Sequence, residues 1–136
     1  MSFVATRRPI AAFPLSIIVN GANGDPVTIE FVAQYHRHSP EQLADLRDGM
    51  ANKIRAAQGL DPIVRPDGHA PAYPYNSDIE FIKDKMAGWL GVRDAMGDSI
   101  PFGEDSLKRV LEDWPELVVP LHNGFFSAHE GAKQKN

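Results

Sequence analysis

The amino-acid sequence predicts an α+β fold, in which an N-terminal β-hairpin at about residues 13–38 precedes a bundle of about four helices. Three observations predict this class. Apolar residues alternate with other residues along 13–38, apolar residues recur at spacings of three and four in several later segments, and turn-forming residues separate these segments. Because the chain has 136 residues, we expect one α+β domain over 1–136.

The hairpin prediction depends on a period of two residues. The residues assigned to the packed face are Phe13, Leu15, Ile17 and Val19 in the first strand and Val27, Ile29, Phe31, Ala33 and Tyr35 in the second. Such alternation is typical of strands that are packed on one side and exposed to water on the other. The intervening NGANGDP contains two Asn-Gly pairs and a proline, which indicate a turn longer than two residues.

A helix is predicted at 40–58. Ser39 suits the N-cap, Pro40 suits the first helical position, and Gln42 can complete a capping box with Ser39. Its expected apolar stripe contains Leu43, Leu46, Met50, Ile54 and Ala57. Gly59 supplies a left-handed cap at the C-terminal end.

A long connection is predicted at 60–77, because this segment contains four prolines and an Asp-Gly turn. Proline lacks the backbone donor that a helix or an interior strand requires. Long connections in small domains often carry function, so we look here first for a partner site. Tyr73 and Tyr75 are the candidate partner contacts in this connection.

The next helix is predicted at 78–87, capped by Asn76 or Ser77. Its apolar side contains Ile79, Ile82 and Met86, and Trp89 lies in line with them. A short turn or hairpin is expected at 92–100, about the segment Asp94–Asp98.

Gly103 is the expected N-cap of a further helix, with Phe102 and Leu107 at the two positions of a hydrophobic staple. Its apolar stripe contains Leu107, Val110, Leu111 and Trp114. Because they lie on apolar stripes, we expect Trp89, Phe102 and Trp114 in the core.

The last helix is predicted to begin at Pro115 and to bend or break at Pro120, followed by a flexible polar tail at 128–136. Phe125 and Phe126 are adjacent, and adjacent helical residues point about 100° apart. Both cannot face one core directly, so one of them can be exposed, and the pair is a second candidate partner contact, although a place in the core is the favoured interpretation.

Composition limits the classes of function. The net charge is −4 with both signs mixed along the chain, which argues against a nucleic-acid partner. Apolar runs are far shorter than the ~20 residues that span a bilayer, and no secretory signal is evident, so we expect no membrane partner. The chain has no cysteine, which excludes disulfides and suits a reducing cytosol.

No reactive motif stands out. His36 and His38 could face the same way on a strand, but the remaining histidines show no fixed metal-ligand spacing, so we expect no metal. The serines lack a nucleophile elbow, and no phosphate-binding glycine loop occurs. Acid–base catalysis needs a carboxyl that is shielded in a pocket, which a sequence does not show, and the helix dipole already explains Glu104 and Asp105. We therefore expect no catalytic residues and no cofactor.

Two segments resemble the tail assembly chaperones of long-tailed bacteriophages and prophages. One is FVAQYHRHSPEQL at Phe31–Leu43, which is similar to the strand-to-helix segment of that family. The other is GWLGVRDAMGDSIPFGEDSLKRVL at Gly88–Leu111, which resembles the family's pattern of Gly-Trp-x-Gly-Val, an acidic turn with glycine, a hydrophobic-Pro-Phe step and an acidic helix. Together the two segments cover somewhat over a quarter of the chain.

The resemblance implies a non-enzymatic protein in the cytoplasm of the bacterial host. Such a protein would bind the long helical tape measure protein, and possibly the tail tube protein, and keep the former soluble while tail tube subunits assemble around it. Two alternatives stay open. One is another small intracellular adaptor or host-interaction protein, and the less favoured one is a small metal enzyme that uses His36 and His38.

Overall fold

The computed structural model describes residues 1–131, and the chain forms two compact units. The first unit comprises residues 1–37 and the chain from Ser77 onward, and we call it the sheet unit. The second comprises His38–Asn76, and we call it the strap unit. The fold is α+β, as predicted, with an N-terminal hairpin and four α-helices among the described residues. Of the predicted polar tail, residues 132–136 lie outside the described part.

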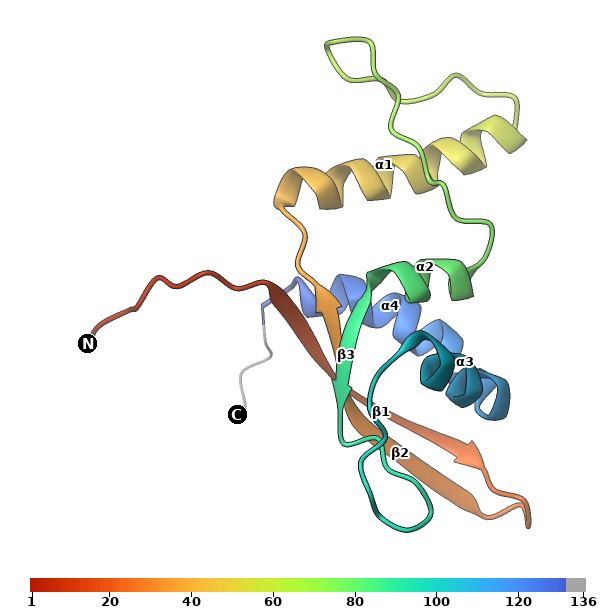
Figure 1. Cartoon of the computed structure of the whole chain (residues 1–136). Coiled ribbons are helices and arrows are strands. Elements are labelled where there is room, and N and C mark those ends of the chain that lie inside the picture. The colour runs from red at the N-terminus through yellow and green to blue at the C-terminus, as the bar shows by residue number, and fades with distance from the viewer. Residues whose placement is uncertain (132–136) are drawn as a thin grey trace. The chain divides into compact units, whose positions relative to one another are not determined.

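The sheet unit contains an antiparallel sheet with the strand order β1-β2-β3 (Figure 1). β1 is Ile10–Asn20 and β2 is Pro26–His36, so the predicted hairpin is confirmed and begins three residues earlier than expected. The register places Ile17 opposite Ile29. Alternate residues of β1 are buried or half-buried from Ala11 to Val19, and the residues between them are exposed, which confirms one packed face.

The third strand, β3, is Met86–Leu90, where the local pattern had predicted the end of a helix. The helix expected at 78–87 ends at Lys85, and Met86 already has extended backbone angles. β3 pairs with Val32–Tyr35 of β2. The helical stripe that seemed to continue to Trp89 was misleading, because an available strand edge overrides a short local pattern.

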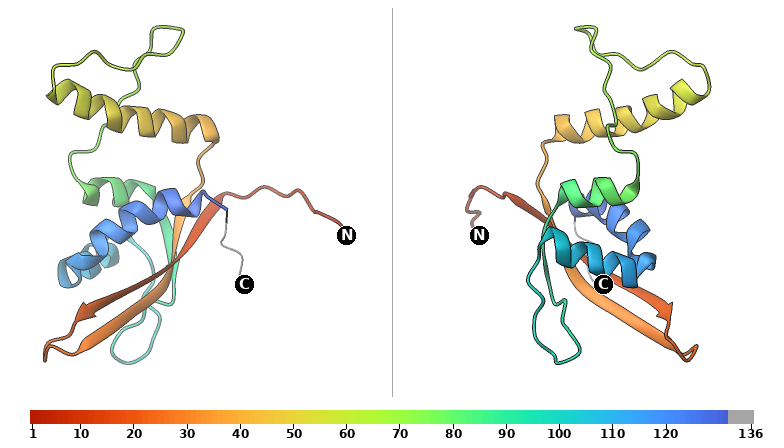
Figure 2. Two further views of the ribbon diagram at one scale, coloured as in Figure 1. Left: turned by 180° about the vertical axis from the view of Figure 1, so that it is seen from behind. Right: turned by 45° about the vertical axis from the view of Figure 1, so that its right-hand side comes forward.

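Four further helical elements complete the sheet unit. They are α2 at Asp78–Lys85, α3 at Glu104–Asp113, the 3-10 turn η1 at Pro115–Leu117, and α4 at Val118–Ala128. α4 contacts β1 and β2, and α2 contacts α4. Figure 2 shows these helices gathered on one side of the sheet.

The predicted effect of Pro120 was wrong in its position. The irregularity lies before this residue, between η1 and α4, and α4 continues through Pro120 without a break. Pro120 is the third residue of α4. Backbone N–H groups in the first helical turn have no partner inside the helix, so proline removes no hydrogen bond there.

The core of the sheet unit is aromatic where α4 crosses the sheet. Tyr35, Phe81 and Phe125 are fully buried, and the ring centroids of Phe81 and Phe125 lie 5.3 Å apart. The Tyr35 hydroxyl donates a hydrogen bond of 2.7 Å to the Leu121 carbonyl, and burial raises the pKa of this hydroxyl. A Cβ atom on Gly124 would lie 2.7 Å from the same hydroxyl, so a glycine is needed for this close approach.

The strap unit contains α1 at Pro40–Ala57 and the segment 58–76, which has no helix or strand. The predicted capping box is confirmed. Ser39 Oγ accepts from the Gln42 backbone N–H at 3.1 Å, and Gln42 Oε1 accepts from the Ser39 N–H at 2.8 Å. Gly59 has a left-handed φ of 71°, as expected at this helix end.

Segment 60–72, which we call the strap, is attached to α1 by polar contacts. The Asn52 side chain donates to the Ile63 carbonyl at 3.1 Å and the Pro71 carbonyl at 2.9 Å, and it accepts from the Ile63 N–H at 2.7 Å. Arg65 bonds to Asp45 and Asp48, and these bonds raise the pKa of its guanidinium. The predicted long connection is therefore confirmed as irregular, and its backbone is bonded to the helix.

The apolar stripe predicted for this helix was wrong in its second half. Leu43 and Leu46 are buried, but Ile54 is 60 % exposed and Ala57 is exposed. Gly49 and Asn52 are buried instead. The strap comes so close to Gly49 that a Cβ there would overlap the carbonyl oxygen of Ala72. The buried side of the second half of α1 thus contains a glycine and a polar side chain, at positions other than those the period predicted.

Candidate partner-binding groove

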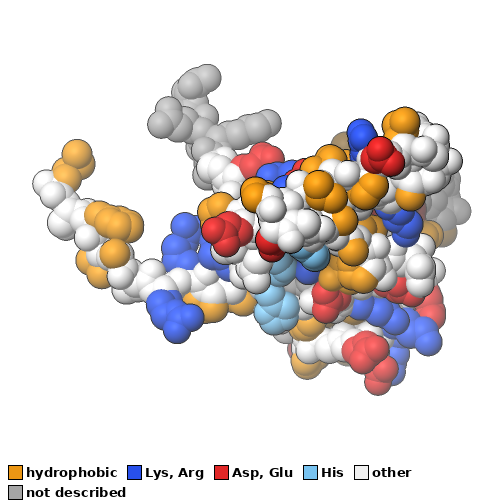
Figure 3. All heavy atoms as spheres, turned by 90° about the horizontal axis from the view of Figure 1, so that it is seen from above, with side chains coloured by type: hydrophobic (Ala, Val, Ile, Leu, Met, Phe, Trp, Pro, Cys, Tyr) orange, Lys and Arg blue, Asp and Glu red, His pale blue; other side chains and the backbone are white. Residues whose placement is uncertain are grey.

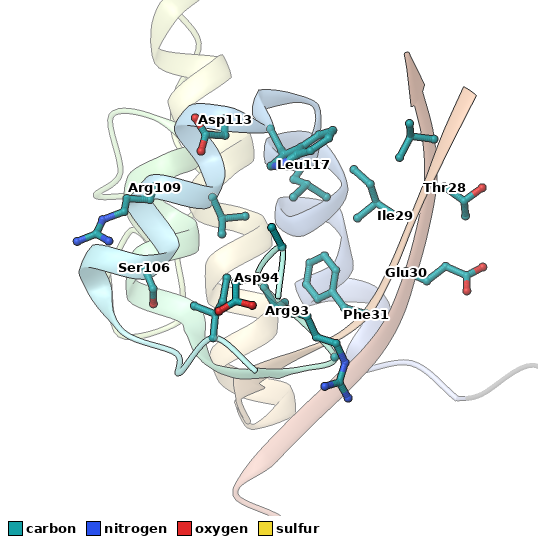
Figure 4. Close-up of a pocket in the computed structure, with 17 residues that line it drawn as sticks. Thr28, Ile29, Glu30, Phe31, Arg93, Asp94, Ser106, Arg109, Asp113 and Leu117 are labelled. Atoms are coloured by element: carbon teal, nitrogen blue, oxygen red, sulfur yellow. The ribbon is translucent and has the colours of Figure 1, made fainter. Parts of the chain in front are cut away.

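An open groove of about 740 Å³ lies within the sheet unit (Figure 4). Three parts of the chain surround it. They are residues 27–31 of β2, the segment 91–95 after β3, and the face of α3 and η1 that is turned toward the sheet. Because every part belongs to the sheet unit, the groove is a feature of that unit alone.

The strand side of the groove follows from the period of two. Ile29 and Phe31 share a face of β2, and Figure 4 shows both side chains pointing toward Leu117, while Thr28 and Glu30 point away. Both apolar side chains are only half-buried. They were assigned to the packed face of the hairpin, which is their face, but the helices cover this end of the hairpin incompletely.

β3 is too short to cover the same stretch of β2. Among the residues that the structure describes, it pairs with Val32–Tyr35 only, so no strand lies beside Pro26–Phe31 on that side. In an antiparallel sheet, backbone groups point alternately toward the two neighbouring strands. About half of the backbone N–H and C=O groups in Pro26–Phe31 therefore face the side that β3 leaves open.

The helix side is held by contacts before α3. Trp89 is buried, and its Nε1 donates to the Ile100 carbonyl at 2.7 Å. The rings of Trp89 and Phe102 meet edge to face with centroids 5.0 Å apart. Gly103 is the N-cap, as predicted, and Ser106 Oγ donates to the Pro101 carbonyl at 2.8 Å. This segment therefore fixes the direction in which α3 leaves the loop and so the width of the groove.

Trp114 was predicted to lie in the core, and this prediction was wrong. Its residue surface is 37 % exposed, and it lines the groove beside Leu117. α3 ends at Asp113, and Trp114 has non-helical angles of φ −129° and ψ 65°. The apolar stripe was extended one residue too far, because the proline at 115 disfavours a helical conformation in the residue before it.

Charged side chains lie at the edges of the groove. They are Glu30, Arg93, Asp94, Arg109 and Asp113, all of them exposed. Asp94 Oδ1 accepts from the N–H groups of Met96 and Asp98 at 2.9 Å and 3.0 Å, which holds the predicted 92–100 turn. An apolar floor with charged edges suits a partner segment that is apolar on one side and polar on the other.

The predicted contacts Tyr73 and Tyr75 belong to the strap unit. Both are half-buried, and their rings meet edge to face with centroids 5.2 Å apart. The Lys53 ammonium donates to the Tyr75 carbonyl at 2.8 Å and lies 5.5 Å from the Tyr73 ring centroid. The pair is thus held against α1, and its role as a partner contact stays a prediction.

The predicted contacts Phe125 and Phe126 belong to the sheet unit. Phe125 is fully buried, and its role as a partner contact stays a prediction. Phe126 is half-buried and stacks on Phe81 with centroids 5.9 Å apart. The expected divergence of the two neighbours is present, but both rings belong to the aromatic core of α4.

The histidines considered as metal ligands are not gathered into one site. His36 is the last residue of β2, and His38 follows two residues later. Within residues 1–131, no group of three or more His, Cys, Asp or Glu side chains is placed to hold a metal ion. His122 packs on Phe81 at 4.5 Å between centroids, and its Nε2 lies 3.8 Å from Asp78.

Sequence reasoning missed the groove because its residues looked like core residues. Apolar stripes include Ile29, Phe31 and Trp114, and these residues are uncovered only because β3 and α3 end early.

None of the helices in the described part of the chain combines the length and apolarity needed to cross a bilayer. Comparisons of the sequence with protein-family models and curated proteins, and of the structure with solved structures, found no match.

Proposed function

We propose that this protein is a non-enzymatic tail assembly chaperone, which binds the tape measure protein in the bacterial cytoplasm and keeps it soluble while tail tube subunits assemble. The observation that carries the proposal is the position of the groove. It lies where the two segments that resemble this family meet, because Phe31 begins the first segment and Gly91 belongs to the second. A Cβ built on Gly91 would lie 3.8 Å from the Phe31 Cα.

The chemistry of the groove suits this task. A long helical protein that has not yet been enclosed exposes apolar stripes, and such stripes associate in water. An amphipathic segment can place its apolar side on Ile29, Phe31 and Trp114, while its polar flanks meet the charged edges of the groove. The groove is open along one side, so the segment can leave it sideways when tube subunits replace the chaperone.

The proposal is tested by expressing the tape measure protein of the same genome with and without this chain. We expect the wild-type chain to raise the soluble fraction of the tape measure protein and to co-purify with it. Val27→Asp, which places a charge in the groove at a residue that is 37 % exposed, should abolish both effects.

Ile18→Asp is the matched control. It makes the same kind of change on the same hairpin, but Ile18 is 72 % exposed on the other face of the sheet. We expect this variant to behave as the wild type does, and circular dichroism should show that both variants are folded. An insoluble tape measure protein in the presence of the wild-type chain, or equal behaviour of the two variants, would refute the proposal.

A further inference from the structure

The N-terminal segment ahead of β1 presents apolar side chains to solvent. We call residues 1–8 the arm. All of them are exposed, with Phe3 at 87 % and Val4 at 77 %. In Figure 3, seen from above, apolar and basic side chains follow one another along this segment. Single exposed apolar residues are common, but a run that includes Met1, Phe3 and Val4 is a surface of the kind that proteins cover.

The arm and the groove are chemically complementary. The arm has no helix or strand and combines apolar residues with Arg7 and Arg8, and it contains no acidic residue. The groove has an apolar floor and lies beside the part of β2 that no strand covers within the described residues. Three carboxylates, Glu30, Asp94 and Asp113, lie at its edges beside two arginines, Arg93 and Arg109, so the edges have a net charge of −1.

The distribution of charge favours the same pairing. The whole chain has a net charge of −4, and the arm contributes two positive charges, so the remainder of the chain has a net charge of −6. Two copies of an acidic protein repel each other at a distance, unless a basic segment of one meets an acidic surface of the other. The arm is such a segment.

The arm of one molecule reaches Ile29 in the groove of that same molecule only when it is fully extended. The Pro9 carbonyl accepts from the Arg37 N–H at 2.9 Å, so the ladder between β1 and β2 extends to the base of the arm, at the end opposite the hairpin turn. Ile29 of the groove pairs with Ile17, which lies about 23 Å along β1 from Ile10. The far side of β2 lies two strand spacings, about 10 Å, to the side of β1, at right angles to the strand direction. The straight-line distance from Ile10 to that side of Ile29 is therefore about 25 Å.

Phe3 lies seven residues before Ile10, and a fully extended chain of that length reaches at most about 25 Å. The arm would have to reverse at Pro9 and run straight back with no slack. A neighbouring molecule imposes no such limit, since its arm can enter the groove from any direction that the open side allows.

We propose that the arm of one copy binds in the groove of a second copy of this chain. The bound arm lies extended along Pro26–Phe31 of β2, with Phe3 on the apolar floor near Trp114 and with Arg7 and Arg8 beside the carboxylates at the edges of the groove. An extended segment beside an uncovered strand can pair with its backbone, while alternate side chains enter the neighbouring groove. The protein therefore associates with itself, and this association does not depend on the tape measure protein.

Sedimentation velocity of the untagged full-length chain tests the proposal, from about 5 to about 500 µM, a range that detects micromolar dissociation constants. We expect the average mass of the wild-type chain to rise above that of the monomer as the concentration increases. Phe3→Asp should weaken the association about 30-fold or more, which is typical for the loss of a buried aromatic anchor. Ser2→Asp adds the same charge at the neighbouring position and keeps Phe3, so it should associate much more strongly than Phe3→Asp.

A peptide experiment assigns the binding site. The Phe3→Asp full-length chain keeps its groove and lacks a competent arm, so it can accept a synthetic peptide of residues 1–9. We expect the peptide to shift the tryptophan emission to shorter wavelengths as it covers Trp114, and to bind at least about tenfold more weakly when Val27→Asp is added to the acceptor. Ile18→Asp in the acceptor should leave the binding unchanged.

Three results would overturn the proposal. They are a wild-type chain that stays monomeric over the whole range, a Phe3→Asp chain that associates as the wild type does, and peptide binding that Val27→Asp leaves unaffected. None of these experiments contains the tape measure protein, so this proposal and the proposed function can fail separately.

Discussion

The sheet unit and the strap unit are stabilised by different kinds of contact. In the sheet unit, large apolar side chains such as Phe81, Phe125 and Leu121 are excluded from water almost completely. In the strap unit, the side chains of Asn52 and Arg65 join the strap to α1 through hydrogen bonds and ion pairs. One unit thus has an apolar core, and the other has a helix to which an irregular segment is bonded.

The difference follows from the residues of the strap. It contains three prolines, and a segment of this kind cannot form a ladder of its own. Its backbone groups must still find partners wherever water is excluded. Asn52 supplies them because one amide side chain offers both donors and an acceptor. Polar side chains on a helix can therefore take the place that apolar ones have in the sheet unit.

The largest effect is expected from Phe125→Ala. This residue is fully buried against Tyr35 and Phe81, and truncation of such a ring lowers the free energy of unfolding by about 3–5 kcal/mol. Urea unfolding followed by circular dichroism measures the loss. Amide hydrogen exchange at residues 60–72 should change little at low urea. If hydrogen exchange accelerated equally in both units, the two units would unfold together, and the contrast between their stabilising contacts would not hold.

Asn52→Ala should destabilise the strap unit and leave the sheet unit unchanged, the opposite of Phe125→Ala. It removes three hydrogen bonds at about 1 kcal/mol each, so we expect the strap to become less stable by about 3 kcal/mol. Hydrogen exchange at the Ile63 N–H should accelerate, while exchange in β2 stays as in the wild type. Asn52→Asp keeps the acceptor for Ile63 but places a carboxylate oxygen against the Ile63 and Pro71 carbonyl oxygens, so it should destabilise the strap at least as much as alanine does. A protected Ile63 in the alanine variant would contradict this account of the strap.

Gly49→Ala is expected to change the free energy of unfolding by less, and the sign of the change shows whether the strap rests on this residue. In an exposed helix, alanine in place of glycine stabilises by about 1 kcal/mol. Here the new Cβ would lie 2.6 Å from the Ala72 carbonyl carbon, so the strap must move, and we expect a net loss of about 1–2 kcal/mol. The thermal unfolding temperatures of the variant and the wild type show whether the substitution stabilises or destabilises the protein. A stabilised variant would mean that the strap does not rest on this residue.

Tyr35→Phe should have the smallest effect at neutral pH, about 1 kcal/mol, because it removes one hydrogen bond to Leu121. The variant also changes the pH dependence. Burial raises the pKa of Tyr35 in the folded state, so its contribution to stability is complete below pH 10 and is lost as the pH rises above that value.

The wild-type chain should therefore lose up to about 1.4 kcal/mol more per pH unit above pH 10 than Tyr35→Phe loses, as measured by urea unfolding at pH 7 and at about pH 11. This difference should appear in the sheet unit. Parallel pH profiles for the wild type and the variant would show that the hydroxyl does not titrate with unfolding.

The sequence was sufficient wherever structure is decided by near neighbours. The capping box of Ser39 and Gln42, the cap at Gly103 and the alternation along β1 all involve residues a few positions apart, and each was predicted from those residues. The α+β class followed, because the two periods occur in different parts of the chain.

The sequence was insufficient wherever distant segments meet. β3 depends on an edge of β2 about 55 residues earlier in the chain, which a local pattern cannot reveal. Asn52 is buried because a later, irregular segment bonds to it, and such contacts have no period. The candidate site was missed for the same reason, since Ile29 and Trp114 become groove residues only through what fails to cover them.

Gly91, the residue that follows β3, has a φ of 89°, a conformation that residues with a side chain rarely adopt. The chain therefore turns away from β2 at Gly91. This single residue limits how far β3 can extend. The length of the groove therefore depends on the position of this glycine in the sequence. We expect that moving this glycine two positions later would let β3 extend along β2 and shorten the groove.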